Sequence, residues 1–208
     1  MKDVAELFFD KKSVLEIQTK LPKLFRIAEI ETSRAGRIGM EVGSLREKII
    51  IALFIYKFGE EKVNAEIPIT EPEVDVFVNN RPYSIKTITG NGGIKAVWTV
   101  DAESSANFIK MYEPKCAIFL TQIFWGQEKD SVWLIPLKVQ QDVFNKLGRN
   151  KYLNLPKVGT NPRGIEFSRE AISMMLNDKE SLKITISWKR DDMNYDVYEK
   201  WVDQWKNI

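Results

Sequence analysis

The sequence has no histidine and only one cysteine, Cys116, among its 208 residues. The absence of imidazole excludes Ser-His-Asp and Cys-His hydrolysis, nucleases that bind metal through histidine, and most zinc catalysis. A single cysteine excludes an intramolecular disulfide and a thiolate metal cluster. Since Cys116 stands in an apolar run, we expect an inert core thiol. Carboxylates and lysines remain as groups for catalysis.

The sequence also lacks a long apolar segment. Its longest apolar run, Ile49 to Tyr56, is far shorter than the roughly 20 residues that cross a bilayer, and charge interrupts the N-terminus too early for a signal peptide. We therefore expect a cytoplasmic protein without a membrane partner. The net charge of +2 neither demands nor excludes nucleic acid, because binding depends on local charge clusters.

Composition and periodicity predict one domain over residues 1–208, since 44% of the residues are hydrophobic. Residues 1–30 have helical spacing and predict helices that pack on the core, with a break at Pro22. The later segments predict a mixed β-sheet flanked by helices, an α/β fold. They are a helix from Ser44 to Phe58, a helix from Asp101 to Tyr112, a central strand from Cys116 to Trp125, a strand from Val132 to Leu137, a helix capped by Ser168 and a strand from Leu182 to Trp188.

Residues 74–87 predict a β-hairpin. Two runs with the alternation of half-buried strands flank Asn79-Asn80, which is typical of a turn. A two-residue turn sets Asp75 opposite Ser84, and a four-residue turn sets it opposite Lys86. In both cases Asp75, Ser84 and Lys86 share one face.

An acid and a lysine on one strand pair can hold a divalent cation and a water molecule against a phosphate. Magnesium prefers oxygen ligands, and one or two carboxylates plus phosphate oxygens suffice for it. The pattern thus indicates metal-assisted phosphodiester cleavage. The simpler alternative is a surface hairpin with an ordinary cross-strand ion pair.

Glu47 is the candidate for a second acid. In the helix from Ser44 it lies on the same side as Ile50 and Phe54, which predict the inward face. A carboxylate that points toward a core usually has a partner, and a metal ion would be one. The alternative is a capping box, Ser44-x-x-Glu47, in which Glu47 only bonds back to the Ser44 amide.

These residues resemble the PD-(D/E)XK nuclease superfamily, in the form where the second acid has moved to a helix. Met40, Glu47, Asp75 and Lys86 are separated by 7, 28 and 11 positions. This order and spacing is similar to that of type II restriction endonucleases that cut CGCG and intercalate a methionine. Ser84 departs from the superfamily consensus, and no proline immediately precedes Asp75. The sequence Glu113-Pro114-Lys115 spells the consensus, but no aspartate lies at a suitable distance on an adjoining strand.

The resemblance implies a restriction-endonuclease-like core and a Mg²⁺-dependent enzyme that cleaves double-stranded DNA as a homodimer. Asp75 and Glu47 would hold the metal with the main-chain carbonyl of Ile85, and Lys86 would assist the attacking water. The expected products are blunt CG/CG ends with 5′-phosphates. The host would hold a companion DNA methyltransferase.

The resemblance also implies how DNA is contacted. Met40 would enter the base stack from the minor groove, because a flexible apolar side chain unstacks bases without desolvating a polar group. Arg34 and Arg37, in a glycine-rich basic loop over residues 31–43, would hold phosphates. Met40 as a loop methionine packed on the core is the alternative. For the whole chain, a repair or recombination nuclease and a non-catalytic DNA-binding module stay open.

Two further features have more than one interpretation. Residues 195–206 predict a closing helix whose apolar stripe includes Tyr198, Trp201 and Trp205. We expect this stripe to cover the core, and a dimer interface is the alternative. The glycine-rich loop over residues 89–95 either enters a DNA groove with Asn91 or Lys95, or is a mobile turn.

Overall fold

The computed structural model describes residues 3–35, 37–68, 73–97, 102–154 and 164–207, with the side chains of 102–106 left aside. Its centre is a six-stranded sheet in the order β11-β8-β7-β5-β4-β3. β5 and β7 run parallel and the other neighbours run antiparallel, so the sheet is mixed as predicted. Its strands are β3 Val63–Asn64, β4 Val76–Val78, β5 Arg81–Thr89, β7 Ala117–Ile123, β8 Glu128–Ile135 and β11 Leu182–Ser187.

Two smaller sheets complete the strands. One has the order β6-β10-β9, and the other is the hairpin β1-β2. Their bounds are β1 Ser33–Arg34, β2 Arg37–Ile38, β6 Lys95–Val97, β9 Leu153–Asn154 and β10 Ile165–Phe167. The β1-β2 hairpin corrects the prediction of an irregular basic loop after residue 30.

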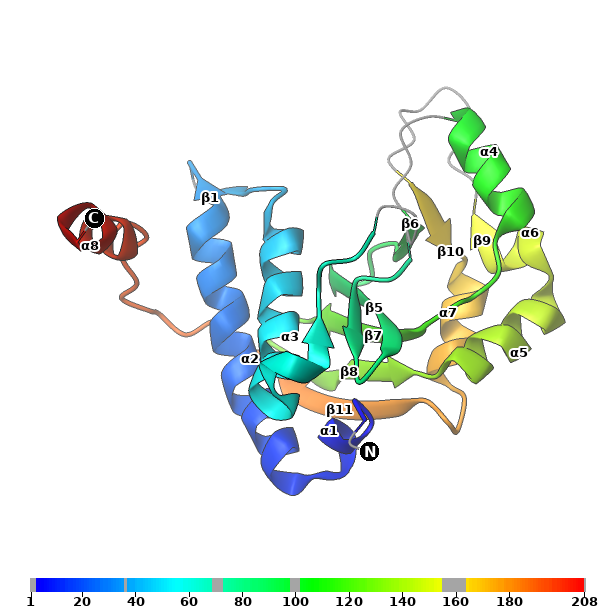
Figure 1. Ribbon diagram of the computed structural model, residues 1–208, viewed down its shortest axis with the longest axis horizontal. Coiled ribbons are helices and arrows are strands. Elements are labelled where there is room, and N and C mark those ends of the chain that lie inside the picture. Colours follow the sequence, from blue (N-terminus) through cyan, green and yellow to red (C-terminus); the bar gives the residue numbers. More distant parts are fainter. Residues whose placement is uncertain (1–2, 36, 69–72, 98–101, 155–163, 208) are drawn as a thin grey trace.

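Helices lie on both faces of the central sheet (Figure 1). α1 to α3 cover one face, and α4 to α7 lie toward the other. The helices are α1 Glu6–Phe9, α2 Lys11–Thr32, α3 Val42–Phe58, the short η1 Glu60–Lys62, α4 Ala102–Met111, α5 Leu137–Leu147, α6 Arg149–Tyr152, α7 Arg169–Leu176 and α8 Glu199–Asn207. None of these described helices is both long enough and apolar enough to cross a membrane.

The core divides in two because the central strand β7 is buried on both faces. Phe119 and Ile123 belong to the cluster beneath α1 to α3, while Ile118 and Leu120 belong to the cluster on the other face. This is the period-two alternation of a strand, and it explains the nearly continuous apolar run in the sequence. Cys116, just before β7, is buried as expected, and burial raises the pKa of its thiol to about 12.

The predicted break at Pro22 is wrong. α2 continues through Pro22, which is itself buried in the helix. A proline inside a helix costs about 3 kcal/mol. Burial of the neighbours Ile17, Leu21 and Phe25 contributes about 1.5–3 kcal/mol for each side chain and offsets that cost.

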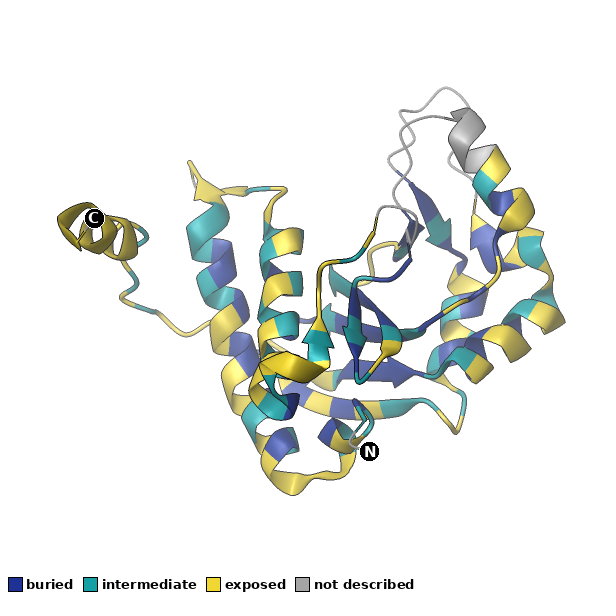
Figure 2. Cartoon of the chain, viewed as in Figure 1, coloured by how far each residue is buried: buried dark blue, intermediate teal, exposed yellow. Residues whose placement is uncertain are grey.

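The prediction that the closing helix covers the core is also wrong. Every residue of α8 is exposed, and Tyr198, Trp201 and Trp205 retain 69%, 59% and 89% of their accessible surface (Figure 2). α8 stands away from the sheet beyond α2 (Figure 1). The Ser168 cap is confirmed, since its hydroxyl accepts from the Ala171 amide at 3.0 Å. The predicted cap Asp101 lies outside the described residues.

Candidate active site

The β4-β5 hairpin positions the first acid. Its turn has two residues, Asn79 and Asn80, with φ of 50° and 61°. Asparagine tolerates this left-handed region, and such turns match the twist of paired strands. Because Val76 pairs with Tyr83, the hairpin register places Asp75 opposite Ser84, as predicted for a two-residue turn.

Asp75 is held by three donors from β5. One oxygen, Oδ2, accepts from the Ser84 hydroxyl at 3.0 Å and from the Ile85 amide at 2.6 Å, and it lies 3.5 Å from Lys86 Nζ. The Asp75 and Lys86 side chains are 20% and 16% exposed. The carboxylate is therefore fixed by the main chain of the strand that bears the lysine, and it stays accessible to a ligand.

Glu47 comes from α3, a helix that packs against β5. The helix begins at Val42, with Glu41 as its N-cap residue, so Ser44 lies inside the first turn and the capping-box interpretation is wrong. The inward face of α3 is set by Ile50, Phe54 and Phe58, all of which are buried. Glu47 lies one turn before Ile50 and is half-buried at the end of that face.

Glu47, Asp75 and Lys86 meet in one cavity of about 330 Å³. Burial is the main cause that raises the pKa of Glu47, and the charge of Asp75 raises it further, while Lys86 lowers it. The two carboxylates are thus close enough to repel each other. A cation between them would relieve that repulsion.

The donor set fits magnesium. The cavity offers two carboxylates, and magnesium takes one or two of them together with water and phosphate oxygens. No cluster of three or more acidic, histidine or cysteine side chains suited to a metal is found among the described residues. A zinc site built from such a cluster is therefore not seen in this part of the chain.

The predicted DNA contacts differ in their relation to this cavity. Met40 lines its mouth and is 82% exposed, so the alternative of a methionine packed on the core is wrong. Arg34 and Arg37 face each other across the exposed β1-β2 hairpin. Ile85 and Lys95 line the same cavity, whereas Asn91 lines a neighbouring one of about 840 Å³.

Sequence reasoning missed an ion-pair network that joins α2, α3 and the end of β5. Glu29 is fully buried in α2, and it accepts from Arg46 Nη2 at 2.9 Å and from Trp125 Nε1 at 2.8 Å. Arg46 also donates to the Thr89 hydroxyl at 3.2 Å. Arg46 precedes Glu47 in α3, and Thr89 ends the strand that bears Lys86. The network therefore ties together the two elements that form the site.

A third acid near the site was also missed. Glu73 is 8% exposed, and burial raises its pKa to about 7, against a hydrogen bond from Tyr112 that lowers it. Its main-chain carbonyl accepts from the Cys116 thiol at 3.6 Å. The only signal in the sequence was the alternation Glu73-Val74-Asp75, which places Glu73 next to the hairpin. That pattern predicts a Glu73 side chain that faces solvent, whereas the side chain is buried.

Comparisons with known proteins agree with this geometry. The family model of restriction endonuclease ThaI matches residues 7–207. A solved structure described as a restriction endonuclease in complex with substrate DNA is 46% identical, with a TM-score of 0.89 over 98% of this chain and 99% of that one. No match was found among curated proteins. The family match spans nearly the whole chain, so the protein belongs to the ThaI restriction endonuclease family.

Proposed function

We propose that this protein is a homodimeric, Mg²⁺-dependent type II restriction endonuclease that cuts double-stranded DNA at CGCG and leaves blunt ends with 5′-phosphates. The observation that supports it best is the convergence of Glu47, Asp75 and Lys86 in one cavity. Membership in a restriction endonuclease family and the likeness to a solved enzyme–DNA complex support the substrate class.

In this proposal Asp75 and Glu47 would hold the metal ion, and the Ile85 carbonyl would be a further ligand. When bound, the ion would supply Lewis-acid chemistry to the phosphate and to the attacking water. Lys86 orients the attacking water and offsets negative charge as the P–O3′ bond breaks. The oxygen of water becomes part of the 5′-phosphate, and the leaving oxygen takes a proton to become a 3′-hydroxyl.

The contacts with DNA extend from the mouth of the same cavity. Met40 is an exposed, unbranched apolar side chain 7 positions before Glu47, and we assign it to the base stack on the minor-groove side. Arg34 and Arg37 lie on the hairpin before it and bind phosphates. A palindromic target calls for a two-fold dimer in which each protomer cuts one strand. The host's own CGCG sites would be protected by a companion methyltransferase.

Plasmid cleavage tests the proposal. We expect discrete fragments that end at CGCG when Mg²⁺ is present and intact plasmid when it is chelated. A plasmid without CGCG should stay intact under both conditions. Smears or structure-specific nicks would indicate a repair nuclease instead, and binding without cleavage would indicate a DNA-binding module.

A further inference from the structure

The C-terminal helix presents an apolar surface that its own chain does not cover. Tyr198, just before α8, and Trp201, Val202 and Trp205 within it follow the spacing of one helical face, and the exposed fractions of the four range from 47% to 89%. We call these four residues the α8 aromatic face. A monomer rarely exposes several large apolar side chains together without a binding function.

Contacts before and at the start of α8 fix where this face begins. Tyr195 Oη and Lys200 Nζ both donate to Glu31 near the end of α2, the lysine at 2.7 Å. These bonds hold α8 at the end of α2, while the helix itself extends away from the body of the molecule (Figures 1 and 2).

A complementary surface lies on the outer side of α2 and α3. It is an apolar groove of about 280 Å³, which we call the α2/α3 groove, lined on α2 by Leu21 and Leu24 and on α3 by Ile49, Leu53 and Tyr56. Leu24 and Tyr56 are 41% and 62% exposed. The groove therefore offers open apolar walls to a helix with large side chains.

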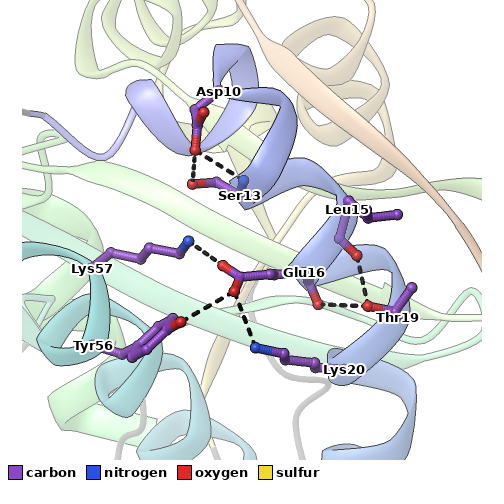
Figure 3. Close-up of polar contacts among 8 residues, drawn as sticks. All are labelled: Asp10, Ser13, Leu15, Glu16, Thr19, Lys20, Tyr56 and Lys57. Atoms are coloured by element: carbon purple, nitrogen blue, oxygen red, sulfur yellow. Dashed lines mark hydrogen bonds and ion pairs between the residues drawn. The ribbon is translucent and has the colours of Figure 1, made fainter.

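The rim of the groove has an excess of positive charge, and α8 together with its ion-pair partner Glu31 has an excess of one negative charge. Figure 3 shows the Glu16 carboxylate accepting from Lys20, Lys57 and Tyr56. Two lysines thus surround one acid, which leaves a positive rim. In α8, Lys200 is paired with Glu31 and Lys206 lies 3.5 Å from Asp203, so the negative charge that α8 offers to this rim is that of Glu199.

The α8 aromatic face does not occupy the groove of its own chain. The groove residues of α2, 16–24, precede Glu31 by 7 to 15 positions, which corresponds to roughly 10–22 Å along a helix. α8 begins beside Glu31, to which Lys200 donates, and it buries none of its residues against its own chain. We propose that the α8 aromatic face of one copy docks in the α2/α3 groove of a second copy, reciprocally, around a two-fold axis.

This docking rests on the homodimer of the proposed function and assigns its interface. Three aromatic rings from each copy would bury about 900–1,500 Å² in total. A stable, specific interface needs about 1,200–2,000 Å². The rings and the groove walls together reach that range.

The test uses the full chain in two experiments. Equilibrium sedimentation, alone and with a short CGCG duplex in Ca²⁺, gives the dimer dissociation constant. Trp201→Ala and Trp205→Ala should each weaken the dimer at least tenfold, because buried tryptophans dominate interfaces. Met111→Ala is the matched control, since Met111 is 78% exposed and lies away from α8 and the groove. A far-UV circular dichroism spectrum equal to that of the wild type would confirm that the body of each chain stays folded.

Cysteine crosslinking identifies the docked surfaces. Cys116 is the only native cysteine and is buried, so introduced thiols react selectively. A chain with Trp205→Cys mixed with a chain with Leu24→Cys should form a disulfide-linked heterodimer, and Trp205→Cys mixed with Lys138→Cys should not. A wild-type chain that stays monomeric in both conditions, aromatic variants that dimerise normally, or a Trp205→Cys/Leu24→Cys double variant that crosslinks only within one chain would each overturn the docking. Cleavage of CGCG by a chain that fails this test would leave the nuclease assignment standing.

Discussion

Lys86 Nζ lies 3.5 Å from the Asp75 carboxylate, which also accepts from the amide of the preceding residue, Ile85. In the proposed function this lysine acts on the attacking water. Replacing Lys86 by alanine should lower the single-turnover cleavage rate by about 10²–10⁴-fold, the usual contribution of one positioned catalytic group. Duplex affinity should be nearly unchanged. Lys179→Ala, on an exposed turn, is the control. Normal turnover of Lys86→Ala would remove its assigned role.

Met40 is predicted to act in binding and not in the chemical step. Its side chain is 82% exposed in the free protein, and burying it between bases contributes about 1.5–3 kcal/mol. Met40→Ala should therefore weaken binding to a CGCG duplex about tenfold or more, measured by fluorescence anisotropy in Ca²⁺. Metal affinity should stay at the wild-type value. Equal duplex affinity of the two proteins would show that Met40 does not intercalate.

At the scale of elements, the site depends on the distance between α3 and β5. Arg46 of α3 donates to Thr89 of β5, and Glu29 of α2 neutralises Arg46. Arg190 lies 3.2 Å from the second carboxylate oxygen of Glu29. Glu29→Gln leaves the Arg46 guanidinium buried without its counter-charge, which should lower the free energy of unfolding by about 3–5 kcal/mol. Urea denaturation measures this loss. The exposed Glu6→Gln on α1 should change stability by less than about 0.5 kcal/mol; equal effects of the two changes would contradict the network's role.

The Glu16 cluster gives α2 and α3 a pH-dependent contact. Hydrogen bonds from Lys57 and Lys20 lower the pKa of Glu16 from 4.5 to about 2. A depressed folded-state pKa adds stability above the unfolded value, and this stability is lost as pH falls from 4.5 toward 2. Glu16→Gln should therefore flatten the fall of the urea midpoint across that window. An acid limb as steep as that of the wild type would assign the acid sensitivity to other groups.

The elements differ in how far the sequence could predict them. The hairpin was predictable, and its register was one of the two that the sequence allowed. Both the turn residues and the alternation of the strands lie within about 15 residues of sequence. The continuity of α2 through Pro22 was not, because packing against the sheet outweighs local propensity. The capping box failed for a similar reason: α3 starts two residues before Ser44, within the segment that follows the β1-β2 hairpin.

For the whole molecule, the features that the sequence did not predict depend on contacts between residues far apart in the chain. Glu29 and Trp125 are 96 positions apart, and no periodicity links them. The exposure of α8 likewise depends on the path of the chain after β11. Its apolar stripe has the spacing of a helix that packs on a core, yet the stripe faces solvent. The spacing of Met40, Glu47, Asp75 and Lys86 was more informative than any single motif, because it reflects how α3 and the hairpin meet.

The central claim is that Glu47 and Asp75, from separate elements, share one cation. The most direct measurement is the affinity of the protein–duplex complex for Mn²⁺, determined by isothermal titration calorimetry. The proteins compared are the wild type, Glu47→Gln, Asp75→Asn and the exposed control Glu180→Gln. The account predicts that the first two variants each lose at least tenfold in affinity and that the control binds as the wild type does. Wild-type affinity in Glu47→Gln would contradict it.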